Sequence, residues 1–416
     1  MATDKDKLVP EIRFKGFCDA WEQRKLGEVV EKLKSYSLSR DVETTELTGY
    51  RYIHYGDIHK QIADMVTKDE QLPNIKKGDY ISIEQGDLVL ADASEDYIGI
   101  AEPCVILHKP KNKIIAGLHT IAIRPLNTNH LFLYYLFHTD GFKKFGGYVG
   151  TGLKVFGITY NNLSRYETRY PTLPEQTTIG NFFRTLENAI AFHKHKCICL
   201  KKLKKGYLQQ MFPQNGESVP KIRFKGFTGD WEVKKLGEIV NWSKGQGLSK
   251  DELNENGIGT PALHYADLYK FNAVEKKIIH WTESTSGRII PNNSILFPMS
   301  DVTPDGLART TTLTINGVKA GGDVLIGELC KNIISIFISY QVNANYKAIL
   351  PFVTGTTVKH INASSLSELD VFIPTIKEQI AIGNFFYNLD EQITTKQVKI
   401  EKLKQLKTAY LQKMFI

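Results

Sequence analysis

Two short stretches of the chain bring together cationic, aromatic and hydrogen-bonding side chains. The stretches IHYGDIHK (residues 53–60) and LHYADLYK (residues 263–270) share a His-Tyr-x-Asp pattern that a lysine follows. Such groups suit contacts with the phosphates and base edges of a nucleic acid. The alternative is that the pattern, with Asp57 and Asp267, builds a structural turn. The candidate DNA-binding residues in and beside these stretches are Arg51, His54, Tyr55, Lys60, His264, Tyr265 and Lys270.

A second pair of segments contains a Thr-Gly dipeptide near a lysine. The segments are YVGTGLKVFGIT (residues 148–159) and FVTGTTVKHINAS (residues 352–364). Their backbone N–H groups and their charge suit a phosphate, although neither segment is a P-loop because no Gly-Lys-Ser/Thr follows. A simple glycine turn is the alternative. The candidate residues here are Thr151, Lys154, Thr354 and Lys359.

The motifs of the common catalytic and metal sites are missing from the sequence. It contains no G-x-S-x-G, no H-E-x-x-H, no clean G-x-G-x-x-G and no [DNS]-P-P-[YFW] tetrapeptide of the amino-methyltransferases. The five cysteines include no C-x-x-C pair, and Cys197 and Cys199 would lie on different faces of a helix. We therefore predict that the chain has no catalytic residue, no metal and no bound cofactor.

The candidate residues lie in a chain that repeats itself. PEIRFKGFCDAWEQRKLGEVV (residues 10–30) and PKIRFKGFTGDWEVKKLGEIV (residues 220–240) match at 14 of 21 positions. Later, PTLPEQTTIGNFF (171–183) matches PTIKEQIAIGNFF (374–386), and YLQQMF (207–212) matches YLQKMF (410–415). Residues 61–149 and 271–352 barely agree. A framework kept twice around different interiors indicates two versions of one binding device, and drift after duplication is the alternative.

Each copy combines a mixed α+β domain with a long helix. Short β-like runs broken by turn residues predict the strands, for example YISI (80–83), GDLVLA (86–91) and TIAIRP (120–125). The stretch TNHLFLYYLFHTDGFKKF (128–145) predicts a helix with Asn129 near its start.

The long helices carry apolar residues at heptad spacing, which predicts that they pair as a coiled coil. One chain contains both helices, and only a short linker follows the first, so we expect an antiparallel pair about a pseudo-twofold axis with one domain at each end. The predicted seam residues are Ile179, Phe183, Leu186, Ile190 and Leu200 in the first helix and Ile382, Phe386, Leu389, Ile393, Ile400 and Leu403 in the second.

The positive charge is concentrated in these helices. The chain carries +8, of which residues 175–212 carry +5 and residues 376–416 carry +3. The basic faces suit a DNA duplex, and the alternatives are simple solvated faces or docking surfaces for a partner. Because the domains are neutral overall, they must bind DNA through local clusters of charge. No apolar run is long enough for a membrane span and MATDKDKLVP has no signal-like region, so we expect a cytoplasmic protein without membrane contact.

The whole arrangement resembles the specificity subunits of type I restriction-modification systems. The resemblance rests on two F-x-x-x-W-E-x-x-K-L-G-E openings and two P-T-x-x-E-Q-x-x-I-G-N-F-F segments that lead into heptad helices. It implies an α+β fold with two tandem mixed α/β target recognition domains, separated by two long helices that form an intramolecular antiparallel coiled coil. The implied division is domain 1 at 1–172, spacer helix 1 at 173–212, a linker at 213–221, domain 2 at 222–375 and spacer helix 2 at 376–416.

The resemblance also implies partners. Each domain would read one half of a split double-stranded DNA target, and the chain would dock two methyltransferase subunits, through which motor-nuclease subunits join. S-adenosylmethionine would bind the methyltransferase partner. The main alternative is a protein-interaction scaffold without sequence-specific DNA binding. An enzyme that modifies DNA by itself is the weaker alternative, because the catalytic motifs are missing.

Overall fold

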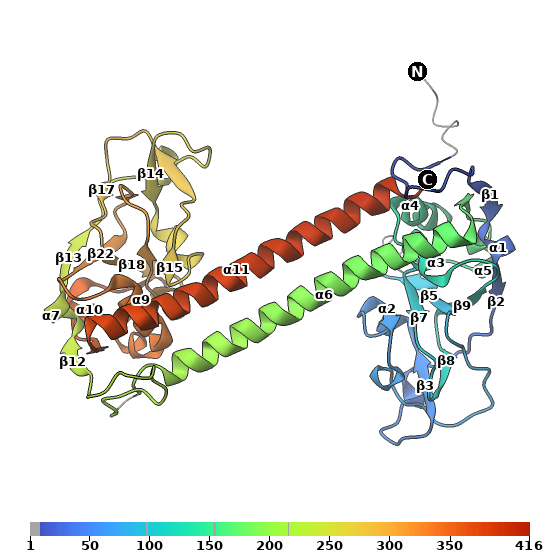
Figure 1. Cartoon of the computed structure of the whole chain (residues 1–416), viewed down its shortest axis with the longest axis horizontal. Helices are drawn as coiled ribbons and strands as arrows, with labels where there is room; N and C mark the ends of the chain where they lie inside the picture. The colour runs from blue at the N-terminus through green and yellow to red at the C-terminus, as the bar shows by residue number, and fades with distance from the viewer. Residues whose placement is uncertain (1–8, 97–98, 153–154, 215) are drawn as a thin grey trace. The chain divides into compact units, whose positions relative to one another are not determined.

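Each of the two long helices contributes to two structural units. The computed structural model describes residues 9–96, 99–152, 155–214 and 216–416. Helix α6 spans Leu173–Gln210 and helix α11 spans Ile376–Lys413 (Figure 1). The first unit contains Met1–His193 with Lys399–Ile416, and the second contains Lys194–Val398. Each unit therefore holds one α+β domain, the first part of the helix that follows this domain and the last part of the other helix.

The first domain is built on a mixed five-stranded sheet. Its strands lie in the order β2 (Val30–Lys32), β9 (Thr120–Pro125), β5 (Leu88–Ala91), β7 (Pro103–Ile106) and β4 (Met65–Val66), and only β4 pairs in parallel with its neighbour. Three further pairs are β1 (Glu22–Lys25) with β11 (Glu167–Tyr170), β3 (Tyr50–Ile53) with β8 (Lys113–Ala116), and β6 (Ala93–Ser94) with β10 (Phe156–Gly157). The short helices are α1 (Leu26–Val29), α2 (Tyr55–His59), α3 (His130–Leu136), α4 (Asp140–Val149) and α5 (Tyr160–Leu163).

The second domain keeps the framework with smaller sheets. Strands β13 (Val240–Lys244), β22 (Val324–Leu329) and β18 (Ser294–Pro298) form one sheet, and β16 (His280–Thr282), β14 (Thr260–Leu263), β21 (Lys319–Ala320) and β17 (Arg288–Ile289) form another. The pairs are β12 (Glu232–Lys235) with β24 (Asp370–Ile373), β15 (Val274–Glu275) with β20 (Thr312–Leu313), and β19 (Ser300–Asp301) with β23 (Lys359–His360). The helices are α7 (Leu236–Ile239), α8 (Pro304–Leu307), α9 (Ser335–Ala344) and α10 (Ala363–Ser367), with a 3₁₀ turn η5 at Tyr265–Tyr269.

Two local predictions need correction. The helix predicted after Asn129 is two helices, because the side chain of Thr139 accepts a hydrogen bond from Phe142 N and starts α4 as a new helix. Asn129 does cap α3, as predicted. The YISI run forms only a single bridge, between Ile83 and Ile114, and is not a strand. Of its two isoleucines, Ile83 is buried, whereas Ile81 is 62% exposed.

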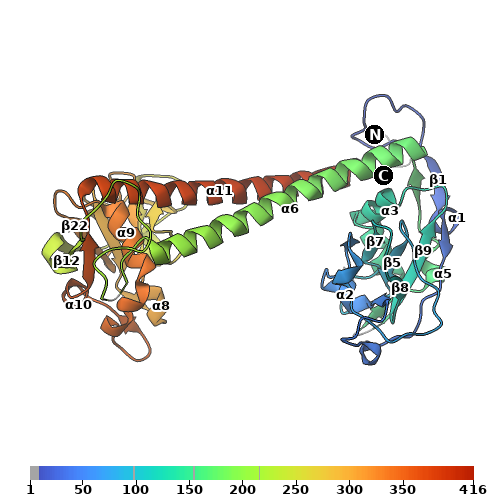
Figure 2. The same cartoon turned by 60° about the horizontal axis from the view of Figure 1, so that its bottom comes forward.

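The end of each long helix closes the core of the domain in the other copy. In the first unit, Phe415 is buried, with its ring centroid 5.2 Å from that of Phe132 and 5.9 Å from that of Phe183. In the second unit, Phe212 takes the equivalent place, 5.6 Å from Phe337 and 5.8 Å from Phe386. The repeated YLQ-x-MF motif is therefore a core-closing segment, and both views show the end of α11 beside the start of α6 in the first unit (Figures 1 and 2).

The Glu of each E-Q motif anchors the segment that opens its copy. Arg13 Nε and Nη2 donate to the two carboxylate oxygens of Glu175, both at 2.7 Å. Arg223 makes the same paired contact with Glu378 at 2.6 and 2.7 Å. Both glutamates are fully buried, so each guanidinium is the counter-charge that its buried carboxylate needs. This bidentate pair ties the IRF segment to the first turn of the long helix.

The Gln of each E-Q motif fixes the neighbouring helix. Gln176 Nε2 donates to Pro171 O at 2.8 Å, and its Oε1 accepts from Asn129 N at 2.9 Å, at the start of α3. Gln379 likewise donates to Pro374 O and accepts from Ile334 N, both at 2.9 Å. The E-Q motif thus connects the first turn of each long helix to the segment that opens its copy and to the start of a domain helix, α3 or α9.

Within each unit the parts of α6 and α11 run antiparallel. In the first unit the ring centroids of Phe182 and Tyr410 lie 5.2 Å apart, and in the second unit those of Phe385 and Tyr207 lie 5.2 Å apart. The repeat offset of 203 residues converts one pair into the other, which is the contact pattern that a pseudo-twofold relation requires.

A polar group repeats in the same way. Lys407 of α11 contacts Glu187 of α6, which accepts from Tyr135 Oη at 3.1 Å. In the second unit Lys204 Nζ donates to both oxygens of Asp390 at 2.6 and 2.8 Å, and Tyr340 Oη donates to the same carboxylate at 2.7 Å. Each group links a domain helix to both long helices and so fixes their register.

The predicted seam residues lie on the inner face of these helices. Ile179, Phe183, Ile190, Ile382, Phe386, Leu389, Ile393 and Leu403 are buried, and Leu186, Leu200 and Ile400 are half-buried. The α+β class and the antiparallel packing are therefore confirmed within each unit.

We predict that Phe415→Ala destabilises the first unit by about 3–5 kcal/mol, because a large buried ring is removed from a core that includes Phe132 and Phe183. Denaturant unfolding, with hydrogen exchange of the α3 and α9 amides, measures the effect in each unit. Val398→Ala is the matched control, since that side chain of α11 is 60% exposed and its loss should change stability by less than about 0.5 kcal/mol. Equal loss of protection in α3 and α9 would contradict the assignment of Phe415 to the first core.

Candidate nucleic-acid interface

The His-Tyr-x-Asp pattern folds into the same capped turn in both domains. Asp57 Oδ2 accepts from His54 N at 3.0 Å, and Asp267 Oδ2 accepts from His264 N at 3.0 Å. The imidazole Nδ1 of each histidine accepts a backbone N–H two residues later, at 3.1 Å in α2 and 3.3 Å in η5. The shared histidine and aspartate thus build the turn, which is the structural alternative left open above. They position the residues around them.

The turn leaves three kinds of candidate residue in different surroundings. Lys60 and Lys270 are exposed, and Tyr55 and Tyr265 are half-buried beside them. Burial lowers the pKa of His54 and of His264 below the usual 6.5, so both imidazoles are neutral at pH 7. The lysines can therefore contact phosphates, whereas the histidines offer only neutral hydrogen-bonding groups.

Arg51 does not lie on this surface. Its side chain is 8% exposed, and Nη1 donates to the carbonyl oxygen of Leu72. Strand β3, which carries it, pairs with β8 and is covered by the segment around Leu72, so the guanidinium faces the interior. This placement argues against Arg51 as a DNA contact and corrects the prediction made from its closeness in sequence to His54.

The Thr-Gly segments form narrow hairpins. Thr151 pairs with Gly157 through two backbone hydrogen bonds of 3.0 and 2.8 Å, and Thr354 pairs with His360 through two of the same lengths. Gly355 has φ +103°, and a Cβ there would lie 2.2 Å from Val358 O, so the turn requires glycine. Thr151 and Thr354 are exposed, Lys359 Nζ donates to Gly355 O at 2.7 Å, and Lys154 lies outside the described residues.

The structure brings the capped turn and the hairpin together in each domain. His59 Nε2 lies 2.8 Å from Ala93 O in β6, and β6 pairs with β10 of the hairpin. In the second domain Tyr269 Oη donates to Ser300 O in β19, which pairs with β23 of the hairpin. The sequence could not show this neighbourhood, because the linking strands β6 and β19 lie in the dissimilar interiors.

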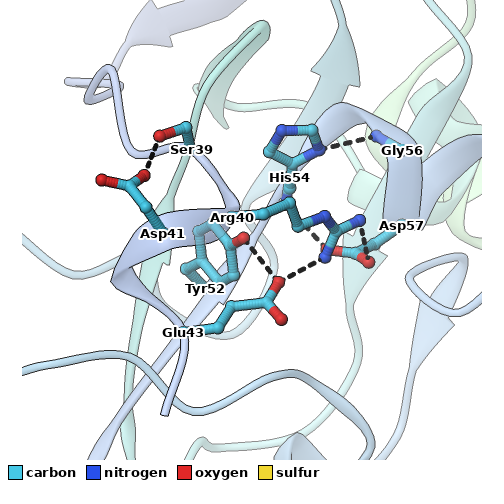
Figure 3. Close-up of polar contacts among 8 residues, drawn as sticks. All are labelled: Ser39, Arg40, Asp41, Glu43, Tyr52, His54, Gly56 and Asp57. Carbon is cyan, nitrogen blue, oxygen red and sulfur yellow. Dashed lines mark hydrogen bonds and ion pairs between the residues drawn. The ribbon is translucent and has the colours of Figure 1, made fainter.

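Sequence reasoning missed the side chains that pair with the two buried aspartates. Figure 3 shows Arg40, which donates through Nη2 to Asp57 Oδ1 at 2.8 Å and through Nη1 to Glu43 Oε1 at 2.6 Å. Tyr52 Oη donates to the same Glu43 oxygen at 2.8 Å. In the second domain His280 Nδ1 lies 2.9 Å from Asp267 Oδ2. Arg40 lies in a Leu-Ser-Arg-Asp stretch (residues 38–41) that the second copy repeats as Leu-Ser-Lys-Asp (residues 248–251), whereas His280 lies in the dissimilar interior.

A pocket opens where these elements meet in the first domain. Its lining includes Arg40, His54, Tyr55, His59, Lys60 and Ser94. In the described parts of the chain, no group of three or more His, Cys, Asp or Glu is arranged to hold a metal ion. No helix within the described ranges is long and apolar enough to cross a membrane.

Comparison with known proteins assigns the family. The model of the type I restriction modification DNA specificity domain matches the chain twice, at residues 19–202 and 228–405. The chain belongs to this family. Among curated relatives, it is 23% identical to the type I restriction enzyme MjaVIII specificity subunit of Methanocaldococcus jannaschii, over 93% of this chain and 90% of that protein. It is 22% identical to the MjaIX specificity subunit of the same organism, over 89% and 84%.

Two solved structures share the fold of this chain. The S subunit of a type I restriction-modification system from M. genitalium aligns with a TM-score of 0.63 at 14% identity, over 98% of this chain and 99% of that one. A chain from a structure titled for complex assembly and conformational transition of the type I R-M system aligns with a TM-score of 0.51 at 17% identity, over 95% and 97%. The resemblance stated from the sequence is therefore confirmed.

We predict opposite effects for one substitution at two glycines. Gly355→Ala should destabilise the hairpin by about 1–3 kcal/mol, because alanine disfavours the positive φ and its Cβ would clash with Val358 O. Gly206→Ala should stabilise α6 by about 0.5–1 kcal/mol, because nothing lies within 4 Å of a Cβ there. Amide exchange at Thr354 and His360 and denaturant midpoints measure both changes. Unchanged protection of the hairpin in the first variant would show that its turn tolerates a side chain.

Proposed function

We propose that this specificity subunit reads a bipartite double-stranded DNA sequence, with one half-site for each domain. The observation that carries the proposal is the repetition of one framework around different interiors. The buried ion pairs, the core-closing phenylalanines and the capped turns recur in both units, whereas the sheets and the side chains paired with the shared aspartates differ. A shared framework with dissimilar interiors is what two readers of different half-sites need.

The capped turn and the hairpin form the proposed DNA-contacting surface of each domain. Exposed Lys60 and Lys270 contribute phosphate contacts, which hold the domain in register on the duplex. The half-buried tyrosines beside them offer a hydroxyl and a ring edge to the groove. The other proposed contacts come from the hairpins, at Thr151, Lys154, Thr354 and Lys359.

Chemistry on the DNA is proposed to come from the partner subunits. The chain lacks the catalytic motifs, so methylation falls to two methyltransferase subunits, which bind S-adenosylmethionine, and cleavage falls to motor-nuclease subunits that join through the assembled complex. We place this complex in the cytoplasm, with the DNA that it reads.

Exposed apolar side chains of the long helices support two equivalent partner copies. Leu173 and Ile376 occupy equivalent positions 203 residues apart, and so do Leu203 and Leu406. All four are exposed on α6 or α11. A repeated apolar position on each helix suits the binding of the same partner surface twice.

We predict that replacing residues 61–149 with the interior of another family member changes one half-site and leaves the other unchanged. The reason is that Asp57, the E-Q anchor and the whole second unit remain in place. Methylated positions mapped in DNA treated with the assembled complex give the result. Changes in both half-sites, or in neither, would contradict one half-site per domain. If the complex binds all sequences equally, the protein is a scaffold and not a reader.

We predict that inserting one heptad into each long helix changes the preferred spacing between the half-sites but not their sequences. Seven residues add about 10 Å of helix, roughly the length of three base pairs. The heptad is inserted between Lys194 and Gly206 in α6 and at the equivalent place in α11, which keeps the contacts of both helix ends. Selection of bound DNA from a library with variable spacers measures the preference. A spacing preference that does not move would exclude the helices as a ruler.

A further inference from the structure

Asp57 and Asp267 hold equivalent places in the two domains. Their side chains are 1% and 2% exposed, and each accepts the backbone N–H that starts its turn. A buried carboxylate requires a cationic or hydrogen-bonding partner, because an unpaired buried charge strongly destabilises the fold. Each domain must therefore supply such a partner at this place.

The two domains supply it from different parts of the chain. Arg40 lies 17 residues before Asp57, whereas His280 lies 13 residues after Asp267. The residue that matches Arg40 at the repeat offset of 210 is Lys250, and the hydrogen bond to Asp267 comes from His280 instead. The carboxylate thus belongs to the shared framework, whereas the residue that binds it differs between the two domains. A group that distinguishes two readers is expected to show this pattern.

Arg40 is held rigidly and still reaches the surface. Two carboxylates, those of Glu43 and Asp57, bind its Nη1 and Nη2, and Tyr52 from the core fixes Glu43 (Figure 3). The side chain of Arg40 remains 41% exposed and lines the pocket beside Tyr55 and Lys60. A guanidinium has five N–H groups, so these two hydrogen bonds leave three for a ligand. Little rotamer entropy remains to be lost when that ligand binds.

The charge around Arg40 selects the kind of ligand. Glu43 and Asp57 carry two negative charges against the one positive charge of Arg40, and the neighbouring His54 is neutral at pH 7 because burial lowers its pKa. A phosphate that approached this group would meet a net negative charge. A neutral acceptor would not be repelled, and guanine presents two neutral acceptors, N7 and O6, in the major groove. The geometry therefore favours a guanine edge over a phosphate.

We propose that Arg40 is a specificity-determining residue that hydrogen-bonds a guanine in the half-site read by the first domain. This inference rests on the proposed function. In the second domain the equivalent carboxylate holds His280, whose side chain is 17% exposed and which also lies 3.6 Å from Glu255. The shorter imidazole cannot make a bidentate contact with guanine, so the two half-sites differ at the base pair that this group faces.

The test uses the chain assembled with its methyltransferase subunits and a DNA library with randomised base pairs, at several salt concentrations. Arg40→Ala and Arg40→Lys should lower the preference for guanine at one position of one half-site by roughly 5- to 150-fold and leave the other half-site and the salt dependence unchanged. Arg40→Lys keeps the charge that Asp57 needs, so it reports on base reading even if Arg40→Ala fails to fold.

Two lysine variants make the outcome decisive. Lys60→Ala, at a proposed phosphate contact, should weaken binding of all sequences alike and reduce the salt slope by about one. Lys111→Ala, in an exposed pair with Glu70, is the surface control and should change neither quantity. A folded Arg40→Lys complex that keeps every base preference, or that only loses salt slope, would overturn the guanine contact. A wild-type complex with no base preference would instead overturn the proposed function.

Discussion

The insertion of Phe212 and Phe415 into the domain cores is the contact on which the rest of the structure depends. Each ring comes from the end of one long helix and packs against a phenylalanine in the first half of the other, Phe386 or Phe183. Each domain core includes residues from the end of the long helix that belongs to the other copy. Each unit is therefore built from parts of both copies, although each domain carries its own sheets.

Polar interactions near this contact fix the position of each long helix relative to its domain. The bidentate pairs Arg13–Glu175 and Arg223–Glu378 satisfy carboxylates that are fully buried, so removal of either arginine would leave an uncompensated charge. The Lys–acid–tyrosine groups around Glu187 and Asp390 add a second fixed point on each helix. With the register fixed twice, the loops that differ between the copies can vary without moving the framework. A fixed framework with variable loops suits a subunit whose two domains are proposed to read different DNA sequences.

Much of the fold could be predicted from the sequence, because the signals were local or repeated. The heptad seam showed which faces of α6 and α11 are buried, and the short linker after the first helix predicted their antiparallel packing. That the end of each helix packs into the domain core of the other copy was not predicted. Asn129 showed where α3 begins. The order of strands in the sheets could not be predicted, since pairings such as β2 with β9 join residues far apart in a segment without a matching copy.

The candidate site was predicted in part. The turn and the hairpin were found because both copies share them. The shared residues Asp57 and Gly355 stabilise the backbone of the turns, and Arg51, which the second copy does not share, faces the interior. Arg40 and His280 were missed because a contact with an aspartate 17 or 13 residues away leaves no local pattern in the sequence. Only the three-dimensional neighbourhood of a shared aspartate identified them.

The base preference of the wild-type complex, measured at every position of a randomised duplex, shows whether the subunit reads a bipartite sequence. We expect two short preferred sequences that differ from each other and are separated by a spacer of fixed length without preference. A single continuous preferred sequence, two identical halves or equal binding to all sequences would contradict it.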